Sequence, residues 1–169
     1  MSNVILIGYM GCGKTTVGKN LARICDLTFI DTDEQIEVQQ GRTISEIFAT
    51  DSEAGFRDME TKYLEELLAS KEDGLVLSTG GGMAIRPQNQ VLLKQIGTVV
   101  YLQAKPETIY ERVKGDTKRP LLQCEDPLNK IKEMLVNREP SYLAAADHVL
   151  QVDDFKQSEI ADKIKKLIS

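Results

Sequence analysis

The sequence has little of what disulfide-linked, zinc-binding or membrane-spanning proteins require. Its 169 residues include only three cysteines, Cys12, Cys25 and Cys124, at wide spacings and without a Cys-x-x-Cys pair. We therefore expect three reduced thiols and no structural zinc site. The single histidine, His148, cannot build a metal site alone. No apolar run approaches the ~20 residues of a membrane helix, so no membrane partner is expected.

Positive charge is also scarce. The chain has 21 Lys and Arg residues against 26 Asp and Glu residues, which gives a net charge of −5. Nucleic-acid binding depends on neutralising phosphates, so we expect no nucleic-acid partner, and any anionic ligand must be held by local positive charge. The apolar residues 4–7 lack the basic start and the longer apolar core of a secretory signal, which predicts a cytoplasmic protein.

The length fits one domain, residues 1–169, that can bury a core. Short apolar runs predict five strands, at residues 4–7, 27–30, 75–78, 98–102 and 148–152. Helical spacing predicts helices between and after them, at residues 14–25, 33–40, 44–49, 53–70, 87–95, 106–113, 127–146 (with a break near Pro140) and 158–168. Short strands that alternate with helices indicate a parallel sheet covered on both faces.

Residues 8–15 form a phosphate-binding motif. They read Gly-Tyr-Met-Gly-Cys-Gly-Lys-Thr, which matches G-x-x-x-x-G-K-[ST], after a predicted strand and at the start of a predicted helix. In such a loop the backbone N–H groups and the helix start bind phosphate oxygens. Lys14 would reach the β- and γ-phosphates and Thr15 would offer its hydroxyl to Mg²⁺. The loop predicts a nucleotide ligand without separating kinase, ATPase and GTPase.

Two carboxylates, Asp31 and Asp33, follow the second predicted strand. Ligands of open parallel sheets bind at the carboxyl ends of the strands, where the phosphate loop also lies. One carboxylate could orient metal-bound water while the other faces an acceptor hydroxyl, although Asp33 could instead cap the next helix. The third strand, residues 75–78, contains no acid, so Asp31 is the better candidate for the metal.

Further candidates for anion binding lie at the same edge. Residues 80–82 are three glycines after the third strand, which would let backbone approach a ligand closely, unless they form only a flexible turn. Arg57 lies on the preceding predicted helix, where Glu60 could orient it from three residues away. Arg138 lies on the helix before the fifth strand. Each arginine taken alone could equally be a solvated surface charge.

Residues 114–126 show no clear periodicity. A connection of this length inside a small domain is usually either a lid or disordered. A lid would exclude water from a phosphoryl transfer, and Arg119 within it would stabilise charge on the moving group.

Together these segments resemble the shikimate kinases, from residue 4 to the last helix. The matching motifs are the phosphate loop at residues 8–15, F-x-D-x-D at 29–33, F-R-x-x-E at 56–60, T-G-G-G at 79–82, R-P-L-L at 119–122 and R-x-P-x-Y at 138–142. The family usually has Gly-Glu ahead of F-R, and this chain has Ser52-Glu53. We expect Ser52 to cap the following helix as well as glycine would.

The resemblance implies transfer of the γ-phosphoryl group of ATP, with one Mg²⁺ ion, to the 3-hydroxyl of shikimate. The products would be shikimate 3-phosphate and ADP, in aromatic amino acid biosynthesis through chorismate. The implied fold is that of the nucleoside monophosphate kinases: a three-layer α/β/α P-loop kinase with a five-stranded parallel sheet. It would carry a helical substrate-binding segment at about residues 31–61 and the lid at about 114–126.

The resemblance also implies residue roles. ATP would contact Gly11, Cys12, Gly13, Lys14, Thr15, Thr16, Arg112 and Arg119, with Arg112 stacked on adenine. Shikimate would be bound by Asp33, Arg57, Gly80, Gly81, Gly82 and Arg138. Thr15, and Asp31 through water, would hold Mg²⁺. The catalytic groups would be Lys14, Asp33 and Arg119.

Other functions compete with this interpretation. A gluconate kinase would carry a similar phosphate loop and act on another hydroxylated carboxylate. A GTPase usually reads guanine with N-K-x-D, whereas residues 129–132 end in Lys132. A non-catalytic nucleotide-binding module would have no reason to keep all of these catalytic groups together. The sequence shows no coiled-coil heptads or long apolar stripe, so we expect a monomer.

Overall fold

The computed structural model describes residues 2–114 and 125–169. Its centre is a sheet of parallel strands in the order β2-β3-β1-β4-β5. The strands are β1 (Asn3–Ile7), β2 (Thr28–Asp31), β3 (Leu75–Ser78), β4 (Gly97–Gln103) and β5 (His148–Gln151). Strands β1 and β3 are buried along their whole length, because helices cover both faces of the sheet at its middle. The five predicted strands and the α/β fold class are confirmed.

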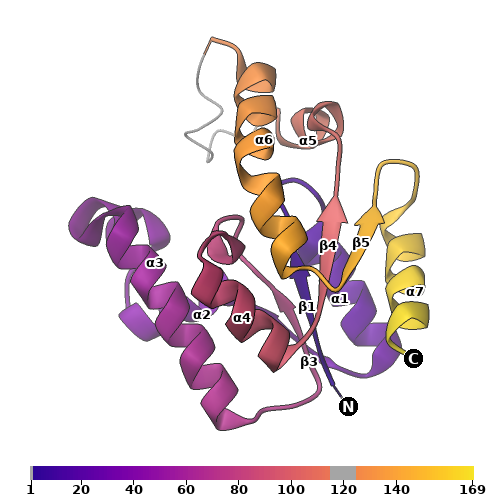
Figure 1. Cartoon of the computed structure of the whole chain (residues 1–169), viewed down its shortest axis with the longest axis horizontal. Helices are drawn as coiled ribbons and strands as arrows, with labels where there is room; N and C mark the ends of the chain where they lie inside the picture. Colours follow the sequence, from indigo (N-terminus) through magenta and orange to yellow (C-terminus); the bar gives the residue numbers. More distant parts are fainter. Residues whose placement is uncertain (1, 115–124) are drawn as a thin grey trace.

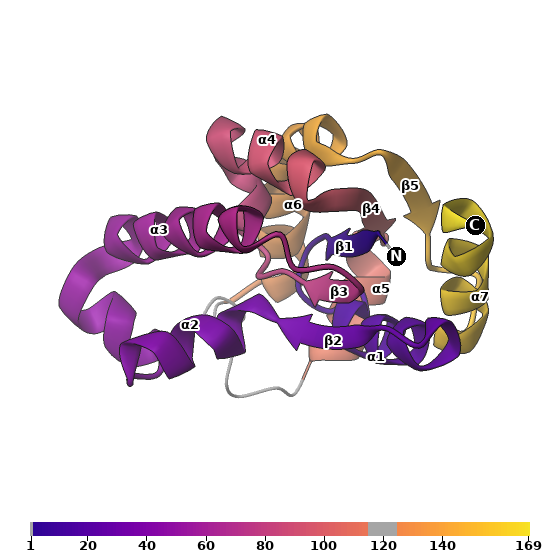
Figure 2. The same ribbon diagram turned by 90° about the horizontal axis from the view of Figure 1, so that it is seen from below.

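Two layers of helices enclose this sheet (Figure 1). Seen from below in Figure 2, α1 (Lys14–Cys25) and α7 (Gln157–Ile168) lie on one side, while α3 (Ile44–Ser70), α4 (Pro87–Ile96) and α6 (Pro127–Ala145) lie on the other. The remaining elements are α2 (Thr32–Gln40), a short 3₁₀ helix η1 (Met83–Ile85) and α5 (Pro106–Val113), which packs on α6. The predicted three-layer arrangement is therefore confirmed.

Three local features refine the predicted elements. Helix α3 is interrupted at Ser52, between the two predicted helices, where φ is 68° and ψ is 174°. Helix α6 continues through Pro140, so the predicted break there is wrong. Proline has a helix-compatible φ and removes only one backbone donor, and buried Tyr142 and Ala145 hold the last turn on the core. The turn η1 was not predicted, since three residues carry no periodicity.

The core is continuous across the sheet. Fully buried side chains of β1 and β4 form one cluster with apolar residues of α1, α3, α4 and α6. Cys12 and Cys25 are both free thiols, as expected, and Cys124 lies outside the described residues. Within residues 2–114 and 125–169, no helix is long and apolar enough to cross a bilayer. The carboxyl ends of the strands meet at one edge, and the site is built there.

Candidate active site

The phosphate loop is the turn between β1 and α1. It needs glycine because φ is 76° at Gly11 and 96° at Gly13, in the region that side chains disfavour. Gly13 immediately precedes α1, so the helix N-terminus opens onto the loop. Lys14 is buried, and its Nζ donates to the carbonyl oxygens of Gly8 (2.6 Å) and Tyr9 (3.0 Å). The loop therefore places a fixed ammonium beside the N-terminus of a helix.

Two side chains from distant segments reach this loop. Arg112, in the last turn of α5, donates from Nη1 to the Gly11 carbonyl oxygen at 3.1 Å. A Cβ atom on Gly13 would lie 3.2 Å from both Arg112 Nη1 and Gln157 Nε2. The structure thus brings Arg112 to the phosphate loop, as the predicted nucleotide contact requires. Gln157, at the start of α7, was not predicted, since neither its position nor its type matched a motif.

Asp31 begins helix α2. Its Oδ1 accepts hydrogen bonds from the backbone N–H groups of Asp33 (2.9 Å) and Glu34 (3.3 Å). This settles the alternative role of Asp33: the cap of the helix is Asp31. The side chain of Asp33 is not used as a cap and lies among the other site residues.

Asp33 is an unpaired carboxylate in a confined position. Its Oδ1 atom is buried and has no hydrogen-bond partner among the described residues. Burial raises the pKa of Asp33 to about 6, and Asp31 adds to this effect, while Lys14 and Arg57 oppose it. A buried acceptor without a donor is costly, which is expected where a ligand hydroxyl completes the hydrogen bond.

The three glycines at 80–82 each lie against one residue that is predicted to bind the phosphoryl acceptor. A Cβ atom on the first would stand 2.6 Å from Asp33 Oδ1, and one on the second would stand 3.4 Å from Arg138 Nη1. A Cβ atom on the third would overlap the Arg57 guanidinium. The absence of side chains therefore allows a carboxylate and two guanidinium groups to converge on one stretch of backbone.

Arg57 is held in place by acids of its own helix. Its Nη1 donates to Glu60 Oε1 at 2.7 Å, and its Nη2 donates to Glu53 Oε1 at 3.3 Å. Burial opposes its charge, but the two carboxylates raise the pKa of Arg57 above its ordinary value. Glu60 is fully buried, and burial raises its pKa to about 7 against the opposing charge of Arg57. The predicted orienting role of Glu60 agrees with this geometry.

Arg138 reaches the site from α6. Its guanidinium carbon lies 5.6 Å from the centre of the Tyr9 ring, within cation–π range. Tyr9 belongs to the phosphate loop, so the nucleotide side and the acceptor side of the site are in direct contact. Tyr9 was not predicted, because a variable position inside a motif gives no signal by itself.

Part of this site is a cavity of about 320 Å³, which neither Arg57 nor Arg138 lines. Lys14, Thr15 and Thr16 line one side, and Asp31, Asp33 and residues 78–81 line the other. A phosphate end of a nucleotide and a small polyol can therefore meet within one space. Cys12 is buried beneath the loop, with Sγ 3.8 Å from Lys14 Nζ.

The cavity also suits a magnesium ion carried in with a nucleotide. Within the described parts of the chain, no group of three or more His, Cys, Asp and Glu residues could hold a metal alone. Thr15 and Asp31 nevertheless face the same cavity. Mg²⁺ keeps several waters and binds through few protein ligands plus substrate phosphates, which fits this sparse donor set.

A family model for shikimate kinase matches residues 10–169. The chain belongs to the shikimate kinase family. A shikimate kinase of Ralstonia nicotianae is 44% identical over 151 residues, which cover 89% of this chain and 78% of that protein. The shikimate kinase of Acinetobacter baumannii, solved in complex with shikimate, has a TM-score of 0.91 at 41% identity and covers 99% of this chain and 93% of that one.

Arg119, with most of the predicted lid, lies outside the described residues, so its role stays a prediction. Ser52 does not cap as expected: no hydrogen bond of its hydroxyl is found in the described chain, and its positive φ belongs to a region that strongly favours glycine. The expectation that serine equals glycine here is wrong, because backbone conformation decides the position.

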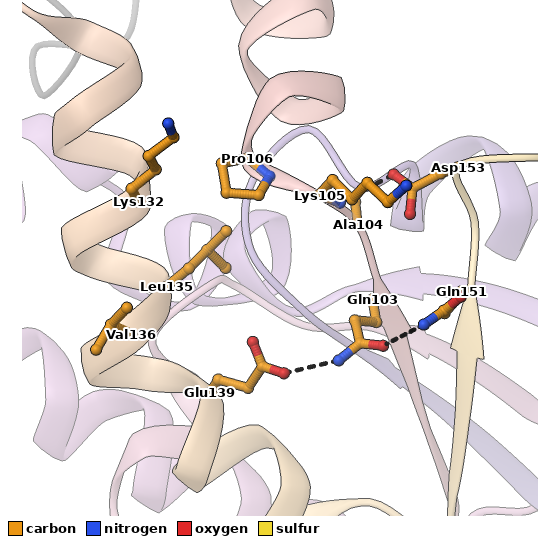
Figure 3. Close-up of a pocket in the computed structure, with 10 residues that line it drawn as sticks. All are labelled: Gln103, Ala104, Lys105, Pro106, Lys132, Leu135, Val136, Glu139, Gln151 and Asp153. Carbon is orange, nitrogen blue, oxygen red and sulfur yellow. Dashed lines mark hydrogen bonds between the residues drawn. The ribbon is translucent and has the colours of Figure 1, made fainter.

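Another pocket of this shikimate kinase family member, of about 490 Å³, lies away from the phosphate loop (Figure 3). It is bordered by α6, the ends of β4 and β5, and the start of α5, and its floor carries a hydrogen bond from Gln103 Nε2 to Glu139 Oε1 at 2.7 Å. Its lining residues, all in the described chain, include none of the predicted site residues. The phosphate loop, not this hollow, marks the site.

Proposed function

We propose that this protein transfers the γ-phosphoryl group of MgATP to the 3-hydroxyl of shikimate, giving shikimate 3-phosphate and ADP. The observation that carries the proposal is the convergence of Asp33, Arg57 and Arg138 on the glycines at 80–82, beside the phosphate loop. Guanidinium groups bind carboxylates through paired hydrogen bonds, and shikimate is a carboxylate. Its ring hydroxyls match the unpaired Asp33 oxygen.

On the nucleotide side, the loop N–H groups and Lys14 bind the phosphates. Arg112, fixed against Gly11, borders the loop where the base would stack. Thr15 directly and Asp31 through water would hold the Mg²⁺ ion, which neutralises charge on the phosphates when bound. Asp31 keeps one carboxylate oxygen for this task, because only its Oδ1 accepts the two backbone N–H groups of α2.

In the reaction, the O–P bond to the acceptor forms as the bond between the γ-phosphorus and the bridging oxygen of ADP breaks. The transition state is loose, so the attacking hydroxyl gains little positive charge until late. Asp33 mainly orients this hydroxyl and accepts its proton late. The raised pKa of Asp33, about 6, makes it a better proton acceptor than an exposed aspartate and still leaves it mostly ionised at neutral pH.

The acceptor is tested by measuring ADP release from MgATP with shikimate, gluconate or nucleoside monophosphates, and with no acceptor. We expect turnover that depends on shikimate. Turnover with gluconate instead would favour the gluconate kinase alternative and would remove Arg57, Arg138 and the three glycines as shikimate ligands. Turnover without any acceptor would indicate an ATPase.

A further inference from the structure

The Tyr142 side chain lies directly behind the acceptor site. It is almost completely buried, and its hydroxyl donates to the Gly81 carbonyl oxygen at 2.6 Å. Its ring packs on Tyr101, with ring centres 5.0 Å apart and planes inclined by 37°. The hydroxyl therefore reaches the central glycine of the triplet from a ring that cannot move freely.

Tyr142 and Arg138 act from the same face of α6. They are four residues apart, and α6 continues through Pro140, so their side chains are neighbours on the helix surface. Burial raises the pKa of Tyr142 to about 12, while the nearby Arg138 guanidinium opposes that rise. The phenol therefore stays protonated at physiological pH and remains a hydrogen-bond donor. Gly81, Arg138 and Tyr142 form one contact group.

This group fixes backbone that would otherwise be free to shift. A Cβ atom on each glycine of the triplet 80–82 would meet one charged side chain of the acceptor site, so a displacement of this backbone would change its clearance from all three side chains. Misplacement of a positioning group by about 1 Å can reduce activity by about 100-fold. The hydrogen bond from Tyr142 to Gly81, at the centre of the triplet, limits such displacement.

We propose that the Tyr142 hydroxyl is a positioning group for acceptor binding, which holds Gly81 and, through it, the spacing to Arg138. The inference rests on the proposed function, because it concerns how the same site holds shikimate. Tyr142 acts through its neighbours and need not touch the reacting atoms. Its role is distinct from packing, since packing would survive removal of the hydroxyl alone.

The test is Tyr142→Phe, which keeps the ring and removes the hydrogen bond. Loss of this hydrogen bond should raise the KM for shikimate by about five- to tenfold. The KM for ATP should stay unchanged, and kcat should change less than the KM for shikimate. Tyr101→Phe is the matched control, because it removes a hydroxyl from the same ring pair without touching the glycine triplet, and its kinetics should match the wild type.

The outcomes are separable. An unchanged KM for shikimate in Tyr142→Phe, or an equal rise in both KM values, would overturn the assignment while wild-type turnover upholds the proposed function. Failure of the wild type to use shikimate would overturn the proposed function and this assignment with it. If the variant is too unstable for kinetics, the rise in Tm that shikimate causes, relative to the unliganded variant, gives the same comparison. A rise equal to that of the wild type overturns the assignment. A smaller rise supports it.

Discussion

At the scale of single residues, Asp33 and Arg57 differ in their hydrogen-bond partners. Asp33 keeps a buried oxygen without a donor among the described residues, whereas Arg57 is already braced by Glu60 and Glu53. The free Asp33 oxygen can accept a hydrogen bond from a ligand hydroxyl. The Arg57 guanidinium, held by two carboxylates, presents its remaining N–H groups in a fixed direction. These two residues should therefore fail in different ways when changed.

Replacing Asp33 by asparagine should affect the chemical step. The amide keeps the size of the side chain but accepts a proton far less well than the carboxylate, so kcat should fall about 100-fold or more. Affinity for the nucleotide should stay nearly unchanged, because Lys14 and the loop N–H groups are intact. Steady-state kinetics and ATP titration measure the two quantities. Undiminished kcat would exclude this role for Asp33.

Replacing Arg57 by lysine should affect acceptor binding. The charge remains but the planar fork is lost, so the KM for shikimate should rise by about 10- to 100-fold. Arg23→Lys serves as the control, because Arg23 is exposed in the last turn of α1, at the opposite end of that helix from the phosphate loop. A rise confined to the KM for ATP would show that Arg57 is wrongly assigned.

At the scale of elements, periodicity predicted the strands and helices, but backbone conformation decided the details. The break between residues 49 and 53 was predicted from the helical patterns, whereas the positive φ of Ser52 was not. Serine gives no sign of such a conformation, because its preference for helix caps suggests an ordinary φ. Pro140 led to the opposite error: a break was predicted there, but α6 continues through it to the buried Tyr142.

Ser52→Gly should stabilise the protein. Glycine adopts φ near 68° without strain, so the free energy of unfolding should rise by about 1 kcal/mol. Ser45→Gly, at an exposed position early in α3, should instead destabilise by about 0.5 kcal/mol. Urea unfolding of both variants measures the difference. Equal losses of stability in the two variants would contradict strain at Ser52.

At the scale of the whole molecule, an acidic chain concentrates positive charge at one edge of its sheet. Lys14, Arg57 and Arg138 arrive from α1, α3 and α6, although the net charge is −5. The sequence predicted this meeting point because carboxyl ends of parallel strands share an edge. It could not predict Tyr9, which lies against Arg138, or Gln157, which lies against Gly13 of the phosphate loop, because both positions arise only from tertiary contact.

The partly buried Asp33 should also make stability depend on pH. Its pKa is about 6 in the folded protein against 3.8 ordinarily, so the folded state binds more protons and stability falls as pH rises between about 4 and 6. Asp33→Asn removes this penalty, so its unliganded Tm should exceed that of the wild type at pH 8 and match it near pH 4. Glu34→Gln, at an exposed position, is the control. A Tm difference that does not vary with pH would contradict the burial of an unpaired carboxylate.

The position of the new phosphate tests the central claim most directly. After incubation of the wild-type protein with MgATP and shikimate, ³¹P and ¹H NMR of the product identify the phosphorylated carbon. We predict one monophosphate, with phosphorus coupled to the proton on C3 and ADP formed in equal amount. A phosphate on another hydroxyl, or ADP without any phosphorylated shikimate, would contradict the proposed alignment of acceptor, Asp33 and phosphate loop.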